Sequence, residues 1–267
     1  GTALLLLPTC WSLALAERGL PSPRLLGIFI AGSFIMRSAG VILNDLADQS
    51  FDRHVARTKS RPLASGELTR NQAFLFLGLL LLAAAGLLLL LNALTIWLAP
   101  VALALAALYP FSKRVMHIPQ AMLGLAFGWG TIMAWTAARG AIDPPAWTVF
   151  AATILWAVAY DTIYAIQDLE DDQRIGVKSA ALFFGSSTWI AVGLALGIML
   201  ALLGAAGLQT GIGWPYFLML GAVSVFFAMQ VRTLRGAVTP SQAFRMFQAH
   251  VWVGLAIFAG LVAGFLA

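Results

Sequence analysis

The sequence predicts an all-α, polytopic membrane protein with nine transmembrane helices around a central cavity, arranged as two similar halves. Of its 267 residues, 61% are hydrophobic and only 10% are charged, and the mean hydropathy is +0.89. Soluble domains carry roughly 25% charged residues. The composition therefore excludes a soluble enzyme, a disordered chain and a nucleic-acid-binding module, and nucleic acid is not an expected partner.

Nine apolar runs carry this prediction, because a spanning helix needs about 20 apolar residues. The runs fall at 2–16, 25–43, 73–91, 93–109, 119–138, 146–167, 188–208, 213–231 and 249–267. Each run must be helical, since lipid offers its backbone no hydrogen-bond partners. Pro100 and Pro215 are tolerable in membrane helices, and the short interval around Asn92 predicts a tight hairpin between the third and fourth spans.

The polar links between the spans predict the topology. Most of the 16 Lys and Arg residues lie in the links after spans two, four, six and eight. The positive-inside rule assigns those links and the N-terminus to the cytoplasm, and the C-terminus to the outside. Cys10 is the single cysteine, so the chain has neither a disulfide framework nor a cysteine metal site.

A first acidic cluster closes the second span. Asn44, Asp48 and Asp52 follow i, i+4, i+8 spacing and share one face of a helix, whereas we expect Asp45 to point elsewhere. Arg37 lies seven residues before Asn44, on the same face and deeper in the membrane. An ionised residue inside a span is costly and is usually functional.

A second acidic cluster closes the sixth span. Asp161, Tyr164, Asp168 and Asp172 also share one helical face. The two clusters hold most of the 11 acidic residues and lie four spans apart. We therefore expect two similar halves whose acidic clusters face one cavity, as in other repeat-built membrane proteins.

Stacked acids of this kind need a neutralising partner. Mg²⁺ suits them, because it takes oxygen ligands and binds through one or two carboxylates plus substrate phosphates. The three histidines have no metal-ligand spacing. Arg57, Arg61 and Lys113 lie nearby in the predicted cytoplasmic links and offer cationic partners to a diphosphate. The pattern thus predicts a magnesium-diphosphate clamp.

Two signatures resemble those of the intramembrane UbiA-type prenyltransferases. The first is N-D-x-x-D-x-x-x-D over 44–52 with R-T-K-S-R-P-L over 57–63, and the second is Y-D-T-I-Y-A-x-x-D-x-x-x-D over 160–172 with I-G-V-K-S over 175–179. The flanking stretches 109–114, 117–120, 127–129 and 156–159 also resemble the family. The likeness spans nearly the whole chain.

The resemblance implies Mg²⁺-dependent transfer of a polyprenyl group from polyprenyl diphosphate to an aromatic acid in the bacterial inner membrane. The flanking residues resemble the branch that prenylates 4-hydroxybenzoate, ortho to its hydroxyl, in ubiquinone biosynthesis. Carried over to this sequence, the Mg²⁺ ligands are Asp48, Asp52, Asp168 and Asp172, and the diphosphate-binding residues are Asn44, Arg57, Arg61 and Lys113. The active site then faces the cytoplasm, and membrane lipid is an expected partner.

Three residues are candidates for the reaction itself. Asp48 belongs to the clamp that draws charge into the leaving diphosphate. Asp161 lies deepest in the second cluster, so we expect it to act beside the allylic cation as a base or by electrostatics. Arg37 is the candidate partner of the acceptor's carboxylate.

Two alternatives stay open at this stage. Intramembrane acids and an internal repeat also suit a transporter of a cation or small anion. Within the family, the acceptor could be a naphthoate, a haem or a chlorin. We expect residues 1–267 to form a single prenyltransferase domain. Related chains begin with a polar, basic stretch before the region that matches Gly1, so we also expect an N-terminal segment to be missing.

Overall fold

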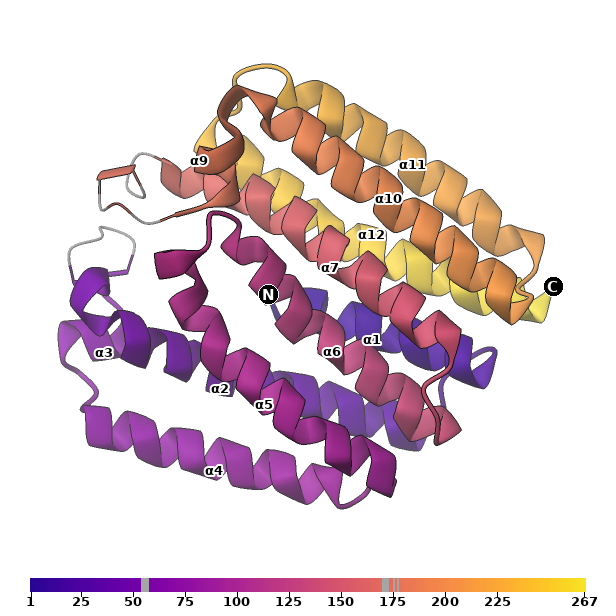
Figure 1. The fold of residues 1–267 in the computed structure, drawn as a ribbon, viewed down its shortest axis with the longest axis horizontal. Helices are drawn as coiled ribbons and strands as arrows, with labels where there is room; N and C mark the ends of the chain where they lie inside the picture. The colour runs from indigo at the N-terminus through magenta and orange to yellow at the C-terminus, as the bar shows by residue number, and fades with distance from the viewer. Residues whose placement is uncertain (54–57, 170–172, 175, 177) are drawn as a thin grey trace.

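The protein is a bundle of long helices (Figure 1). The computed structural model describes residues 1–53, 58–169, 173–174, 176 and 178–267, without the side chains of Ser50, Phe51 and Lys113. The elements are α1 Thr2–Glu17, α2 Pro23–Asp52, α3 Pro62–Ser65, α4 Arg70–Leu88, α5 Ala93–Val115, α6 Pro119–Arg139, α7 Pro144–Ala165, η1 Ile166–Asp168, α9 Ala180–Phe184, η2 Gly185–Ser187, α10 Thr188–Thr210, α11 Trp214–Leu234 and α12 Pro240–Leu266. No strand occurs within these ranges, and the predicted all-α class is confirmed.

The structure does not confirm the exact count of nine spans. In the described part of the chain, eight helical segments are long and apolar enough to cross a membrane. The remaining apolar helix, α1, has 16 residues, or about 24 Å at 1.5 Å per residue, against a hydrocarbon core of about 30 Å. Its last ten residues are almost all buried in protein. The division into two similar halves stays a prediction.

Several helices extend beyond the apolar runs. The predicted span at 249–267 begins nine residues earlier, at Pro240, because Thr239 and Gln242 form a capping box. Helix α5 continues through Pro110 to Val115. The hairpin at Asn92 is confirmed, since its side chain accepts from the backbone N–H of Thr95 at 3.0 Å and caps α5.

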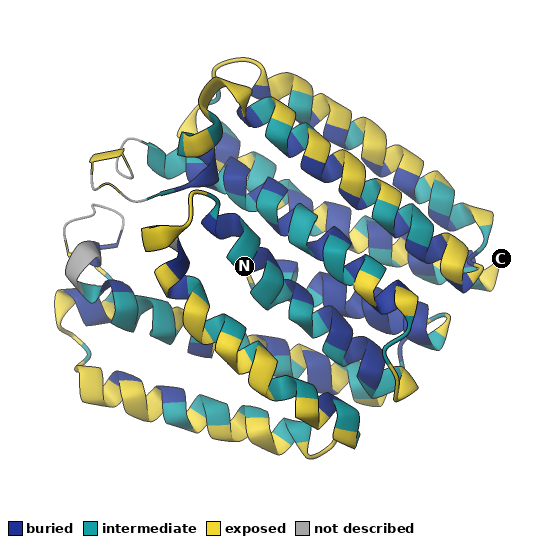
Figure 2. Cartoon of the chain, in the orientation of Figure 1, coloured by how far each residue is buried: buried dark blue, intermediate teal, exposed yellow. Residues whose placement is uncertain are grey.

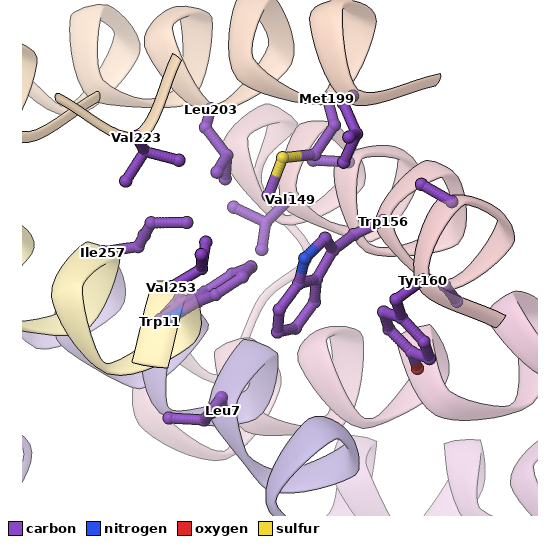
Figure 3. Packing of buried hydrophobic residues seen from close by; sticks show 14 of the residues in the cluster. Leu7, Trp11, Val149, Trp156, Tyr160, Met199, Leu203, Val223, Val253 and Ile257 are labelled. Atoms are coloured by element: carbon purple, nitrogen blue, oxygen red, sulfur yellow. The ribbon is translucent and has the colours of Figure 1, made fainter. Parts of the chain in front are cut away.

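The core lies between α1, α7 and the three C-terminal helices. The rings of Trp11 and Trp156 pack with centroids 4.8 Å apart, and Tyr160 meets Trp156 edge-on at 5.3 Å (Figure 3). Buried indoles need hydrogen-bond acceptors. Trp11 donates to the carbonyl of Gly254 at 2.9 Å, and Trp156 donates to Nδ1 of His250 at 2.8 Å. These contacts fix α7, which supplies Asp161 and Tyr164 of the second acidic cluster.

Gly254 is required by close helix packing in this core. A Cβ atom placed there would stand 2.6 Å from Cδ1 of Leu7 and 3.0 Å from Cη2 of Trp156. Real Cβ contacts are longer than that, so only glycine lets α12 approach α1 and α7 this closely.

The opposite side of the bundle is less buried. Helices α4 and α5 carry few buried residues, whereas α6 and α7 are buried along much of their length (Figure 2). Both α4 and α5 are long and apolar enough to cross a membrane. Their exposed apolar residues therefore form the surface that lipid covers in a membrane.

Candidate active site

A cavity of about 590 Å³ lies between α1, α2, α5, α6, α7 and α12. Its volume falls within the range of small-molecule sites. One wall, here called the acidic wall, consists of Asn44, Asp45, Asp48 and Asp52 of α2. Tyr160, Asp161 and Tyr164 of α7 form another wall. Two polar segments more than 100 residues apart in sequence thus meet at one cavity, where Asp161 is the one described acid of the second cluster among the lining residues.

The first cluster stands on an unbroken helix, because α2 continues to Asp52. Asp48 and Asp52 line the cavity while keeping only 1% and 7% of their surface exposed. Carboxylates are almost never buried this deeply unless they are paired. Burying two carboxylates is energetically costly, and such buried charges are typical of a site that binds cations or cationic groups.

The expectation that Asp45 points elsewhere is wrong. Asp45 lines the same cavity, and its Oδ1 accepts from Nη1 of Arg61 at 2.8 Å. The physical reason is the width of the face: residues three and four apart are both neighbours on a helix, so Asp45 adjoins Asp48 as Asn44 does. Both Asn44 and Asp45, on either side of Asp48 on the helix surface, therefore line the cavity.

Arg61 joins two of these acids. Its Nη1 atom also lies 3.1 Å from Oδ2 of Asp52, and its side chain remains 32% exposed. The preceding turn positions it, because the Thr58 hydroxyl donates to the Asp52 carbonyl at 3.1 Å and the Arg61 N–H donates to the Thr58 carbonyl at 2.9 Å. Arg61 is thus a partly exposed cation at the acidic wall.

Arg114 connects the end of α5 to the same wall. Its Nη2 atom donates to the carbonyl of Ala47 at 2.6 Å and lies 3.6 Å from Oδ1 of Asp48. The sequence reasoning did not select Arg114, although it adjoins Lys113 in a basic stretch. The position of Arg114 ties α5 to α2 beside the most deeply buried acid.

The remaining predicted residues are placed unevenly. Asp168 ends η1, and it is not among the described residues that line this cavity. Arg57 and Asp172 lie outside the described residues, and the side chain of Lys113 is not described. Their assignment to the diphosphate and the metal therefore rests on the sequence pattern.

Arg37 marks the deep end of the polar cavity. It lies in the middle of α2, and its guanidinium carbon is 6.0 Å from the centroid of the Phe127 ring on α6. A guanidinium over an aromatic face gains a cation–π interaction. Arg37 and Asp161 line the same cavity, so a cation and a carboxylate from different helices border one space below the acidic wall.

The donor set suits a hard divalent cation. Asn44, Asp45, Asp48, Asp52 and Asp161, whose side chains all carry oxygen donors, line this cavity. The residues that the structure describes include no group of three His, Cys, Asp or Glu side chains arranged to hold a metal. Mg²⁺ is held by one or two carboxylates together with water and substrate phosphates, so this open set fits it.

A comparison with protein-family models identifies the family of this chain. Residues 5–254 match the model of the UbiA prenyltransferase family. The chain belongs to this family. The predicted resemblance is thereby confirmed, and with it the multi-pass membrane architecture.

Curated relatives agree over nearly the full length. The chain is 44% identical over 265 residues to the 4-hydroxybenzoate octaprenyltransferase of Pseudomonas aeruginosa strain UCBPP-PA14, covering 99% of this chain and 89% of that protein. It is 47% identical to the protein of the same name from Alkalilimnicola ehrlichii, covering 98% and 89%. The Pectobacterium atrosepticum protein of that name is also 47% identical, with 99% and 92% covered.

Solved structures share the fold. The apo structure of a UbiA homolog from Aeropyrum pernix K1 matches with a TM-score of 0.83 and 25% identity, over 98% of this chain and 97% of that one. A UbiA homolog from Archaeoglobus fulgidus, solved with GPP and Mg²⁺, matches with a TM-score of 0.67 and 17% identity over 98% and 100%.

Sequence reasoning missed the contribution of the last helix to the cavity. Phe244, Phe247, Gln248 and Val251 of α12 line it beside Tyr164. The Phe247 ring lies 4.7 Å from that of Tyr164. The basic residues of α12, Arg245 and His250, are not among the described residues that line this cavity, so they gave no signal of this role. A row of apolar residues looks the same whether it faces lipid or a cavity.

Proposed function

We propose that this protein transfers a polyprenyl group from polyprenyl diphosphate to the ring of 4-hydroxybenzoate, ortho to its hydroxyl, as a step of ubiquinone biosynthesis. The observation that carries the proposal is a single cavity with clustered carboxylates at one end and Arg37 with Asp161 at the other. The names of the relatives support the choice of acceptor. The protein acts in the bacterial inner membrane, with its carboxylate end facing the cytoplasm.

The diphosphate binds at the acidic wall. Asn44 and Arg61 contact it from the described part of the chain, and Arg57 and Lys113 complete the set by the sequence pattern. Arg61 is suited to this role because it is partly exposed beside Asp45 and Asp52 and can turn its remaining N–H groups toward phosphate oxygens.

The same wall would hold Mg²⁺. Asp48 and Asp52 would be its ligands there, and Asp168 and Asp172 are the ligands proposed from the sequence pattern of the second cluster. The bound ion supplies positive charge to the diphosphate oxygens, where negative charge grows as the allylic C–O bond breaks.

The acceptor lies deeper, between Arg37 and Asp161. Arg37 pairs with the acceptor's carboxylate through a charge-assisted hydrogen bond. The allylic C–O bond breaks with its electron pair leaving on the diphosphate, and the ring carbon ortho to the hydroxyl bonds to the allylic carbon. Asp161 stabilises the cation and takes up the proton released from the acceptor.

Aromatic and apolar side chains keep water from the allylic cation. Leu123, Phe127, Phe247 and Val251 line the cavity around its deeper part. Excluding water from such a site prevents hydrolysis of a reactive intermediate. The single domain proposed for residues 1–267 brings every part of this arrangement into one chain.

The experiment supplies the purified chain with Mg²⁺, a prenyl diphosphate and 4-hydroxybenzoate, and measures the prenylated acid by mass spectrometry together with released diphosphate. We expect equal amounts of both. A parallel panel replaces 4-hydroxybenzoate by a naphthoate. Product from the naphthoate alone would overturn the acceptor, and no diphosphate release with any acceptor would overturn the proposed reaction.

A further inference from the structure

The C-terminal part of the chain carries charged side chains of one sign only. Residues 173–267 include neither Asp nor Glu, and their five Lys and Arg residues are Arg174, Lys178, Arg232, Arg235 and Arg245. Helices α10 and α11 pack side by side in opposite directions, so the start of α10 and the end of α11 lie at the same end of the bundle (Figure 1). Arg232 stands in the last turn of α11, and Arg235 is its C-cap. Positive charge is therefore concentrated where these two helices meet.

Arg232 and Arg235 have no acidic partner in the described part of the chain. The ion pairs there involve the guanidinium groups of Arg61, Arg114 and Arg139. Arg232 and Arg235 are both exposed, and at a spacing of three residues they are neighbours on the helix surface. Like charges at this spacing repel each other, so an anion bound between the two arginines would be stabilised by both.

An aromatic ring of α10 holds Arg235 at the contact between the helices. The guanidinium carbon of Arg235 lies 4.3 Å from the centroid of the Trp189 ring. This cation–π interaction needs no carboxylate, so the positive charge of Arg235 stays available to an anion. Tryptophan is typical of helix ends at the membrane–water interface. Trp189 therefore indicates that the two arginines lie at the depth of the lipid headgroups.

Both helices present apolar side chains on their exposed faces beside the arginines. On α11, Val225, Met229 and Arg232 follow i, i+4, i+7 spacing, share one face and are exposed. On α10, Ile190 and Leu194 are exposed one turn apart, directly after Trp189 (Figure 2). An exposed apolar face that ends in a cation suits an amphipathic ligand with an anionic head and hydrocarbon chains.

We propose that the junction of α10 and α11 is a binding site for an anionic phospholipid. The phosphate accepts hydrogen bonds from Arg232 and Arg235, and the acyl chains lie along the exposed apolar faces of the two helices. A zwitterionic headgroup fits less well, because residues 173–267 offer no acid to its cationic part. A free phosphate ion has no chains, so it gains nothing from the apolar faces.

The first test measures lipid binding to the purified chain by native mass spectrometry, with phosphatidylglycerol and with phosphatidylcholine. A basic residue near a membrane surface contributes about 1 kcal/mol of attraction to anionic lipid, which corresponds to about fivefold in affinity. Arg232→Gln and Arg235→Gln should therefore each lower phosphatidylglycerol affinity about fivefold, and the double variant about thirtyfold. Binding of phosphatidylcholine as tight as that of phosphatidylglycerol would overturn the proposal.

Two further variants separate a site from a general attraction by net charge. Arg245→Gln removes an exposed arginine near the start of α12 and is the matched control, so its phosphatidylglycerol affinity should stay within about twofold of the wild-type value. Trp189→Leu leaves the net charge unchanged but removes the ring beside Arg235, and it should lower the affinity about twofold to fivefold. A loss in Arg245→Gln equal to that in Arg232→Gln, or no loss in Trp189→Leu, would contradict the site.

Photocrosslinking of the unsubstituted protein gives an independent measurement. Phosphatidylglycerol with a diazirine on an acyl chain should label residues 189–198 and 225–235, and excess phosphatidylglycerol should remove the label. Labelling confined to other helices would overturn the proposal. Removal of the label by inorganic phosphate or by a prenyl diphosphate at the same concentration would also overturn it, because the surface would then bind a free anion or the donor. Neither measurement requires turnover, so its failure would be separate from a failure of the proposed function.

Discussion

Replacing Arg61 by Gln should weaken use of the prenyl donor about thirtyfold. Arg61 holds Asp45 at 2.8 Å and Asp52 at 3.1 Å, and in the proposed complex it also contacts the diphosphate. A hydrogen bond to a charged group contributes about 1.5–3 kcal/mol when buried. Because the Arg61 side chain is 32% exposed, screening lowers each contribution toward about 1 kcal/mol. Two such hydrogen bonds from Arg61 to the diphosphate would total about 2 kcal/mol, which corresponds to about thirtyfold in kcat/KM for the donor.

The assay measures kcat/KM for the donor at saturating 4-hydroxybenzoate, and KM for 4-hydroxybenzoate at saturating donor. The loss should appear in the first quantity and leave the second within about twofold. Arg61→Lys keeps the charge but lacks the planar guanidinium group, so its donor kcat/KM should lie between those of the wild-type protein and Arg61→Gln. Arg70→Gln changes an exposed arginine at the start of α4 and is the matched control. An unchanged donor kcat/KM in Arg61→Gln would refute the assignment of Arg61 to the diphosphate.

Three further predictions concern the deep end of the cavity and the core. Arg37→Gln should raise KM for 4-hydroxybenzoate about thirtyfold, since removing one partner of a buried charge pair costs about 2 kcal/mol or more; an unchanged KM would contradict its role. Asp161→Asn should lower kcat about a hundredfold while leaving donor KM within about threefold, and normal turnover would remove it from the mechanism. Gly254→Ala should lower Tm by several degrees through overpacking against Leu7. Gly197→Ala, which adds a Cβ into open space inside α10, should not lower Tm and should raise it slightly, because alanine stabilises a helix interior relative to glycine.

The spans and the acidic clusters could be predicted from sequence for a clear physical reason. Lipid forces apolar runs into helices, and helical periodicity then places Asn44, Asp48 and Asp52 on one face. The limits of the prediction have equally physical causes. The length of α1 is short of a full span, yet its apolar run looks like any other. Apolarity alone does not distinguish a helix buried in protein from one that faces lipid.

The shape of the site was less predictable than its chemistry. The pairing of Asp45 with Arg61 depends on how the chain turns after α2, and local periodicity carries no information on that turn. The apolar residues of α12 enter the cavity because α12 packs beside α7 and η1.

The most direct test of the magnesium-diphosphate clamp is a Mg²⁺ titration of diphosphate release, with 4-hydroxybenzoate present, in the wild-type protein and in Asp48→Asn. Asp48 is the most deeply buried carboxylate of the acidic wall, and the substitution removes its charge at nearly constant volume. Wild-type activity should vanish with EDTA and return with Mg²⁺. Asp48→Asn should lose at least about a hundredfold in activity, or require far more Mg²⁺. Activity and Mg²⁺ dependence equal to those of the wild-type protein would contradict the clamp.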